Sequence, residues 1–143
     1  MIAVDTNVLV YAHKQGAALH APAKSALSGL AASAAPWAIP WACLQEFYAV
    51  VTHPRIYVPA STPAQALAQI QAWAAVPSLR LLAEAHDHLD RLTALLSAAP
   101  VLGSGVNDAK IAAICLSHGV RELLTMDRDF SRYPSLRTRS LLA

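Results

Sequence analysis

Short apolar runs alternate along the chain with longer segments in which apolar side chains recur every three or four residues. The runs predict strands at residues 2–4, 37–39, 79–82 and 121–125, with a last one at 136–141. The longer segments predict helices at 7–13, 21–32, 41–52, 63–75, 85–98 and 107–118. Parallel strands need crossover connections, and helices of this length supply them, so the pattern predicts an α/β fold with a largely parallel sheet.

End signals and apolar stripes support several of these helices. Thr62 followed by Pro63 is a strong helix start, and Thr6 or Asn7 is expected to cap the first helix. Asn107 is expected to cap the last helix, which ends before Gly119. The stripes that we expect to be buried are Leu44, Phe47, Tyr48 and Val51 in one helix, Ile111, Ile114, Cys115 and His118 in another, and Leu89, Leu92, Leu95 and Leu96 in a third.

Length and composition favour one globular domain over residues 1–143. A chain of 143 residues can bury roughly 70% of the surface that its unfolded form exposes. Hydrophobic residues make up 55% and charged residues 14%, a balance far from that of disordered chains. The apolar excess suggests that part of the surface is covered by a partner, and the hydrophobic helices of the first half are the expected docking surface.

Charge and cysteine usage add little that is specific by themselves. The net charge is only +2, yet five arginines fall in the last quarter, where they would neutralise phosphates or simply be solvated. Cys43 and Cys115 lack metal-site spacing and are expected to be buried thiols. The start has no signal-peptide pattern, and the uncharged run 25–45 contains prolines, so we expect a cytoplasmic protein with no membrane span.

Four of the nine acidic residues occupy equivalent places in this predicted layout. Asp5 and Asp127 each follow an apolar strand, while Glu46 and Asp108 stand early in helices. Strand carboxyl ends and the following helix starts share one edge of a parallel sheet, so all four are expected to meet there. Each acid alone has an ordinary explanation as a helix cap, a turn residue or a solvated side chain.

A cluster of this kind requires a cation. Two carboxylates 4 Å apart repel by about 4 kcal/mol at an effective dielectric of 20, so several together need protons or a metal. Oxygen ligands suit Mg²⁺ or Mn²⁺, and such ions between carboxylates support phosphodiester cleavage by an activated water. The histidines offer no competing site, since His86 and His88 lack the i, i+4 spacing of a zinc helix.

The ordered set of motifs resembles the PIN-domain ribonucleases, and specifically the VapC toxins of VapBC toxin–antitoxin pairs. The resemblance covers nearly the whole chain. It rests on Asp5-Thr6-Asn7, on the stretch from Glu46-Phe47 to Arg55, on Asn107-Asp108-Ala109 and on the segment 124–130. It implies a three-layer α/β/α PIN-like fold and a Mg²⁺- or Mn²⁺-dependent endoribonuclease that forms homodimers and is inhibited by a cognate VapB antitoxin.

The resemblance also implies roles for individual residues. Asp5 and Asp108 would be primary metal ligands, Glu46 would bind metal directly or through water, and Asp127 would complete the site. Asp129 would add a fifth acid beside them. Thr6, Asn7 and Thr125 would hold the carboxylates or the substrate through hydrogen bonds.

Two other classes of function stay open on the sequence. A phosphotransfer or phosphatase domain also places an Asp after its first strand and binds Mg²⁺. Phosphatases of that kind need a second acid two residues later, where this chain has Asn7, and a receiver domain needs an acidic pair at the first strand end. The third reading is a non-enzymatic protein-binding module whose acids are helix caps.

Overall fold

Five short strands form one sheet in which every neighbouring pair is parallel. The computed structural model describes residues 1–142. The strands are β1 (Ile2–Val4), β2 (Trp37–Pro40), β3 (Leu79–Leu82), β4 (Glu122–Leu124) and β5 (Arg137–Arg139), in the spatial order β3-β2-β1-β4-β5. The predicted parallel sheet is therefore confirmed, although β5 is shorter than the expected 136–141.

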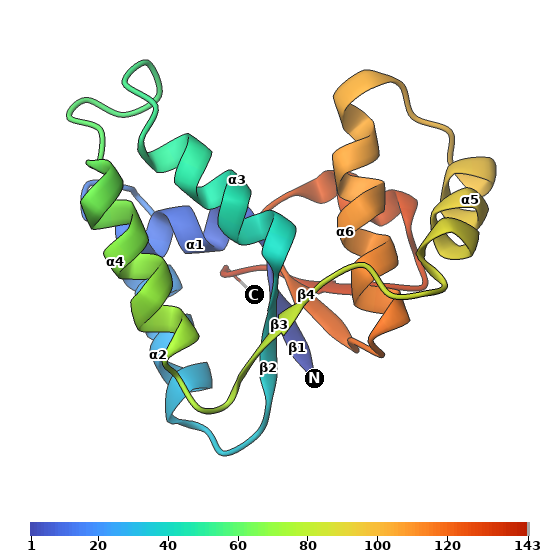
Figure 1. The fold of residues 1–143 in the computed structure, drawn as a ribbon, viewed down its shortest axis with the longest axis horizontal. Coiled ribbons are helices and arrows are strands. Elements are labelled where there is room, and N and C mark those ends of the chain that lie inside the picture. Colours follow the sequence, from blue (N-terminus) through green and yellow to red (C-terminus); the bar gives the residue numbers. More distant parts are fainter. Residues whose placement is uncertain (143) are drawn as a thin grey trace.

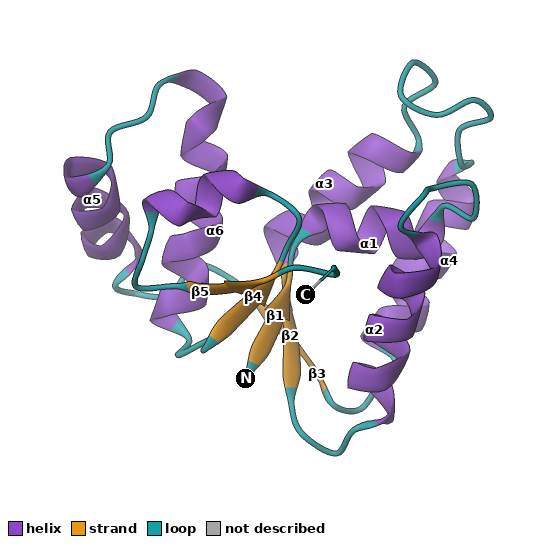
Figure 2. Cartoon of the chain, turned by 180° about the vertical axis from the view of Figure 1, so that it is seen from behind, coloured by secondary structure: helices purple, strands orange, loops and turns teal. Residues whose placement is uncertain are grey.

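Helices cover both faces of the sheet and complete three layers (Figure 1). On one side lie α1 (Thr6–His13), α2 (His20–Ala32), α3 (Trp41–Val51) and α4 (Pro63–Ala74). On the other lie α5 (His88–Ala98) and α6 (Val106–Ser117), and the reverse view in Figure 2 shows the same separation. The three-layer α/β/α arrangement expected from the resemblance is confirmed.

The strand order reverses at β1, and this reversal creates a crevice. From β1 the chain proceeds through α1 and α2 to β2 on one flank, whereas β4 pairs with β1 on the other flank after α5 and α6. In open α/β sheets the crevice outside the strand carboxyl ends at such a reversal is where ligands bind. The segments that follow β1 and β4 therefore meet at the expected ligand edge.

The core confirms most of the predicted stripes. Phe47 is fully buried and its ring contacts His13 and Trp73 edge to face, with centroids 5.2 and 4.9 Å apart. Cys43 and Cys115 are buried and free, as expected. None of the helices within residues 1–142 is long and apolar enough to cross a membrane.

The region around α5 differs from the sequence prediction. The helix begins at His88 instead of Ala85, because the preceding segment forms a turn in which the His88 amide donates to the Ala85 carbonyl. None of its residues is fully buried, and Leu89 is 74% exposed, so the expected inward stripe is wrong at that position. Asp87 instead fastens α5 to α6 by accepting a 2.7 Å hydrogen bond from the Ser117 hydroxyl.

Two predicted helix caps and one predicted buried position also need correction. Asp5, and not Thr6 or Asn7, caps α1, because its carboxylate accepts from the Thr6 amide. A 3₁₀ turn at Gly103–Gly105 leads into α6, which therefore starts before Asn107. His118 is the exposed residue that ends α6, and one of its ring nitrogens lies 2.8 Å from the Ala83 carbonyl oxygen.

Candidate metal centre

Asp5 lies at the centre of the carboxyl edge of the sheet and is only 6% exposed. Its backbone amide donates to the Leu124 carbonyl, which continues the β1–β4 pairing by one residue and fixes Asp5 beside Thr125. Burial raises the pKa of the Asp5 carboxyl, whereas hydrogen bonds from the Thr125 side chain and the Thr6 amide oppose that rise. Asp5 is therefore a rigidly held, partly desolvated carboxylate.

Thr125 and Asn7 form a hydrogen-bonded bracket around this carboxylate. The Thr125 hydroxyl donates to Asp5 Oδ2 at 2.7 Å and accepts from Asn7 Nδ2 and from the Asp127 amide. Asn7 Oδ1 in turn accepts from the Met126 amide at 3.1 Å. The bracket joins the segment after β1 to the segment after β4, so Asp5 and Asp127 are held in a fixed relation.

Glu46 reaches the same edge from α3. It is exposed and lies off the buried stripe of that helix, as the sequence predicted. Its Oε2 accepts a 3.0 Å hydrogen bond from the Thr6 hydroxyl, which orients the carboxylate toward α1. Buried Cys43, one turn earlier, points its thiol at Asp5 Oδ1 with the sulfur 3.7 Å from that oxygen.

Three further carboxylates form the opposite wall. Asp108, in the first turn of α6, and Asp127 and Asp129, after β4, each offer an oxygen, and these oxygens lie within 4.8 Å of one another. The Asp129 amide donates to Asp127 Oδ1 at 2.8 Å, which keeps that loop compact. Their donor set consists entirely of oxygen and therefore fits a hard divalent cation such as Mg²⁺ or Mn²⁺.

The carboxylates of the two walls repel one another when no cation lies between them. Burial, together with the charges of Asp127, Asp5, Asp129 and Glu46, raises the pKa of Asp108 to about 6. A divalent cation would remove the repulsion between these groups. The charge distribution therefore fits the same kind of ion as the donor set.

One pocket joins the residues from both walls. Its lining includes the acids Asp5, Glu46, Asp108 and Asp127, together with Thr6 and Asn7. The sequence-predicted residues are thus brought to one place, with Asp129 beside them on the Asp108 side and Thr125 directly behind Asp5. The pocket has a volume of about 240 Å³.

Sequence reasoning missed four residues at or next to this pocket. Tyr11 and Tyr57 line it beyond the acids, and Cys43 contacts Asp5. Burial and then the charge of Asp108 raise the pKa of Tyr133, which is almost fully buried. Tyr11 lies one turn after Asn7 on α1, which is a spacing that the sequence does contain. Tyr57 lies in an irregular loop without periodicity, so no pattern could have placed it.

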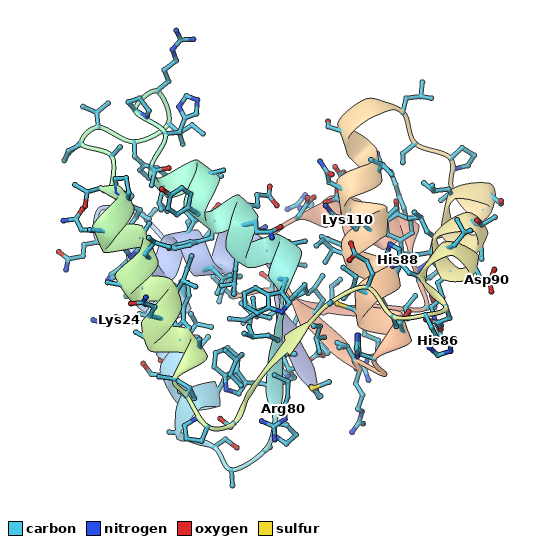
Figure 3. All side chains as sticks on the ribbon, in the orientation of Figure 1. Lys24, Arg80, His86, His88, Asp90 and Lys110 are labelled. Atoms are coloured by element: carbon cyan, nitrogen blue, oxygen red, sulfur yellow. The ribbon has the colours of Figure 1, made fainter. Side chains whose placement is uncertain are left out.

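The histidines stay away from the acids. Figure 3 shows His86 and His88 at the α5 end of the molecule, and Asp90 on the outer side of that helix. His13 is half-buried, and its ring nitrogens lie 2.9 Å from Ser61 Oγ and 3.1 Å from Gln69 Oε1. His20 is also half-buried, with Nδ1 2.9 Å from the Tyr11 carbonyl oxygen.

The five arginines of the last quarter divide into two groups. Arg121, Arg137 and Arg139 surround a hollow with Met1 and Glu122, and Arg139 forms a 2.7 Å ion pair with Glu122. Arg128 and Arg132 belong to the short 3₁₀ segment Arg128–Arg132 directly after Asp127. Only this second group lies within a few residues of Asp127 and Asp129 in the chain.

Comparison with known proteins agrees with the geometry. The family model of the PIN domain matches residues 2–136. Ribonuclease VapC43 of Mycobacterium tuberculosis is 33% identical over 97% of this chain and 94% of the relative. Ribonuclease VapC37 of the same organism is 30% identical over 94% of this chain and 92% of the relative.

Solved structures show the same fold at lower identity. The structure of VapBC2 from Rickettsia felis, bound to a DNA fragment from their promoter, superposes with a TM-score of 0.69 at 21% identity and covers 98% of both chains. VapC20 of Mycobacterium tuberculosis, described as a sarcin–ricin loop cleaving toxin, also gives 0.69, at 18% identity over 92% of this chain and 93% of that one. The chain therefore belongs to the PIN domain family, and the two relatives named above are VapC ribonucleases.

Proposed function

We propose that this protein is an endoribonuclease toxin that hydrolyses RNA phosphodiester bonds with Mg²⁺ or Mn²⁺ and is inhibited by a VapB-type antitoxin. The observation that carries the proposal is the convergence of Asp5, Glu46, Asp108 and Asp127 on one pocket at the reversal point of the sheet. The ribonuclease names of relatives at 30–33% identity over nearly the full length support the same activity.

The residues of the pocket would have different roles in metal binding and hydrolysis. Asp108 and Asp127, with Asp129 beside them, would hold the ion on one wall, and Asp5 would hold it from the other. A divalent cation bound there supplies an activated water and stabilises charge on the phosphate. Glu46, oriented by the Thr6 hydroxyl, would bind the ion directly or through water and help to position the attacking water.

Thr6, Asn7 and Thr125 would preserve this arrangement. Each makes a hydrogen bond to an acid of the pocket: Thr6 to Asp5 and Glu46, and Asn7 and Thr125 to Asp5. Such partners keep ligand carboxylates ionised and correctly rotated, and their loss typically weakens metal binding or activity by about 10- to 100-fold.

The alternatives receive less support. Receiver domains have the strand order 2-1-3-4-5, whereas this sheet is ordered β3-β2-β1-β4-β5. Asn7 stands where the phosphatases need a second acid, and both ends of its amide are used to hold Asp5, Thr125 and Met126. If the acids were only helix caps, nothing would offset the repulsion between Asp108 and the neighbouring carboxylates.

Two protein partners belong to the proposal. We expect a VapB-type antitoxin, because solved relatives of this fold are VapBC complexes, and we expect a homodimer. Trp41 is 45% and Leu67 49% exposed on helices of the first half, which is where the sequence placed the docking surface. A monomeric mass for the isolated chain would refute the homodimer, and a small gene directly upstream would identify the antitoxin.

The activity is tested with purified protein and a labelled, structured RNA at neutral pH, because we expect the protein to act in the cytoplasm. We expect cleavage with Mn²⁺ or Mg²⁺, no cleavage with EDTA, and recovery when excess metal is added back. Cleavage that persists in EDTA would refute metal dependence. A stable mass increase after incubation with acetyl phosphate would instead favour the phosphotransfer alternative.

A further inference from the structure

The pocket does not end at the carboxylates. Beyond the acids, its lining continues over Val10 and Tyr11 of α1, Val50 of α3 and Tyr57 of the loop between α3 and α4. Asn7 and Tyr11 are four residues apart on α1, as are Glu46 and Val50 on α3, so each pair shares a helix face. The aromatic part of the pocket therefore lies about one helical turn, roughly 5.4 Å, away from the acidic part.

Tyr57 is held in place, although it lies in an irregular loop. The Lys14 ammonium lies 4.8 Å from the centroid of its ring and also contacts the Pro59 carbonyl. A few residues further on, the Ser61 amide donates to the Val51 carbonyl, and the Ser61 hydroxyl contacts the His13 ring. The loop is thus tied at several points to the end of α1 and to the end of α3, which keeps Tyr57 at the pocket wall.

We propose that Tyr57, together with Tyr11, forms a nucleobase subsite that receives an unpaired base beside the carboxylate end of the pocket. This inference rests on the proposed ribonuclease function and specifies its substrate as single-stranded or looped RNA. Tyrosine rings in a partly apolar pocket stack with any base, whereas a base in a duplex is already stacked and cannot enter.

The charges around the subsite favour RNA over an apolar peptide as the occupant. Lys14 places a cation over one face of the Tyr57 ring, and a cation there attracts the phosphates of a bound strand. The cleft is continuous with the acids, so a base bound there belongs to a nucleotide whose phosphate can reach them. One strand would thereby contact both halves of the pocket.

The experiment measures RNA binding separately from cleavage. Fluorescence anisotropy in EDTA, where metal-dependent hydrolysis cannot occur, compares a labelled single-stranded RNA of mixed sequence with the same RNA annealed to its complement. The wild-type protein is compared with Tyr57→Ala, with Tyr57→Phe, which keeps the ring, and with the matched loop variant Val58→Ala, whose side chain is 89% exposed.

We expect Tyr57→Ala to weaken single-strand binding about tenfold, as loss of one base–aromatic stack does. Tyr57→Phe and Val58→Ala should bind as the wild type does, and the duplex should bind more weakly than the single strand. Irradiation with RNA that contains 5-bromouridine should crosslink to the peptide that carries Tyr57, a readout that a purely structural tyrosine would not give.

Several results would overturn the inference. They are equal binding by Tyr57→Ala and wild type, equal binding of duplex and single strand, and a bromouridine crosslink that misses the peptide carrying Tyr57. Cleavage of the same RNA with Mn²⁺ tests the nuclease function independently. A wild-type protein that cleaves RNA while Tyr57→Ala behaves identically would refute only the base subsite, and absence of cleavage would refute only the function.

Discussion

Asp108→Asn should stabilise the metal-free protein and destabilise the metal-loaded protein relative to wild type. The pKa of Asp108 is about 6 in the folded chain, against an ordinary value of 3.8. The difference corresponds to about 3 kcal/mol of unfavourable interaction with the ionised carboxylate. Because the side chain is only half-buried, solvent screening reduces this to about 1–2 kcal/mol.

The sign of the pH dependence follows from the two pKa values. Below the unfolded value of 3.8 the carboxyl is protonated in both states, so Asp108 carries no penalty there. As the pH rises through the folded value of about 6, the folded protein must accept a repelled charge, and its stability falls. Asn avoids that charge, so the variant should gain stability at pH 8 and gain nothing near pH 3.5.

Thermal unfolding measures both halves of the prediction. In EDTA at pH 8 we expect the melting temperature of Asp108→Asn to exceed that of wild type by about 2–8 °C. Saturating Mn²⁺ should raise the melting temperature of wild type by mass action and raise that of the variant much less, which reverses the order.

Asp90→Asn is the matched control, because Asp90 also lies in the first turn of a helix but on the outer side of α5 (Figure 3). It should lose a few tenths of a kcal/mol through the helix dipole at all metal concentrations. If Asp108→Asn were destabilised in EDTA to the same extent as Asp90→Asn, or if Mn²⁺ stabilised wild type and Asp108→Asn equally, the reasoning would be refuted.

Three further predictions concern the support of the site, the substrate and the core. Thr125→Val removes the hydroxyl that donates to Asp5, so the pKa of Asp5 should rise and the pH of half-maximal Mn²⁺ stabilisation should move upward. Cleavage should fall about 10- to 100-fold. Thr125→Ser should retain wild-type behaviour, and an unchanged pH profile for Thr125→Val would contradict the bracket. RNA affinity should decrease linearly with the logarithm of salt concentration, and a flat response would argue against backbone contacts. Phe47→Ala should cost about 3–5 kcal/mol in urea unfolding, because Phe47 is fully buried between two aromatic rings; a loss below about 1 kcal/mol would mean that the core repacks freely.

Much of the fold was predictable because local and long-range signals agree. The apolar runs before Asp5 and Asp127 have the length and composition of strands, and the carboxyl ends of parallel strands share one edge of the sheet, which places both acids there. Thr62 and Gln65 form the complete capping box that the Thr62-Pro63 pair indicated. The family resemblance supplied the sheet's partner layers, which periodicity alone does not specify.

The errors arise where tertiary contacts override local preference. Leu89 has the periodicity of a core residue, but α5 is fastened to α6 through Asp87 and Ser117, which leaves that side chain facing outward. The conformation of the loop that carries Tyr57 depends on contacts made by Lys14 and Ser61. Lys14 is distant from Tyr57 in the sequence, and a serine such as Ser61 gives no pattern that predicts its contact. Sequence could therefore predict the acids, which follow regular elements, but not the aromatic wall beside them.

The most direct test of the central claim is the rate of RNA cleavage by Asp5→Asn at saturating Mn²⁺, compared with wild type and with Asp90→Asn. Asn has nearly the same shape as Asp and keeps an oxygen, but it lacks the negative charge that holds a cation. We predict that Asp5→Asn folds and loses cleavage at least about 100-fold, the scale of a lost metal ligand or ligand support, while Asp90→Asn cleaves as wild type does. Wild-type cleavage by a folded Asp5→Asn protein would contradict the assignment of this carboxylate cluster as the catalytic metal centre.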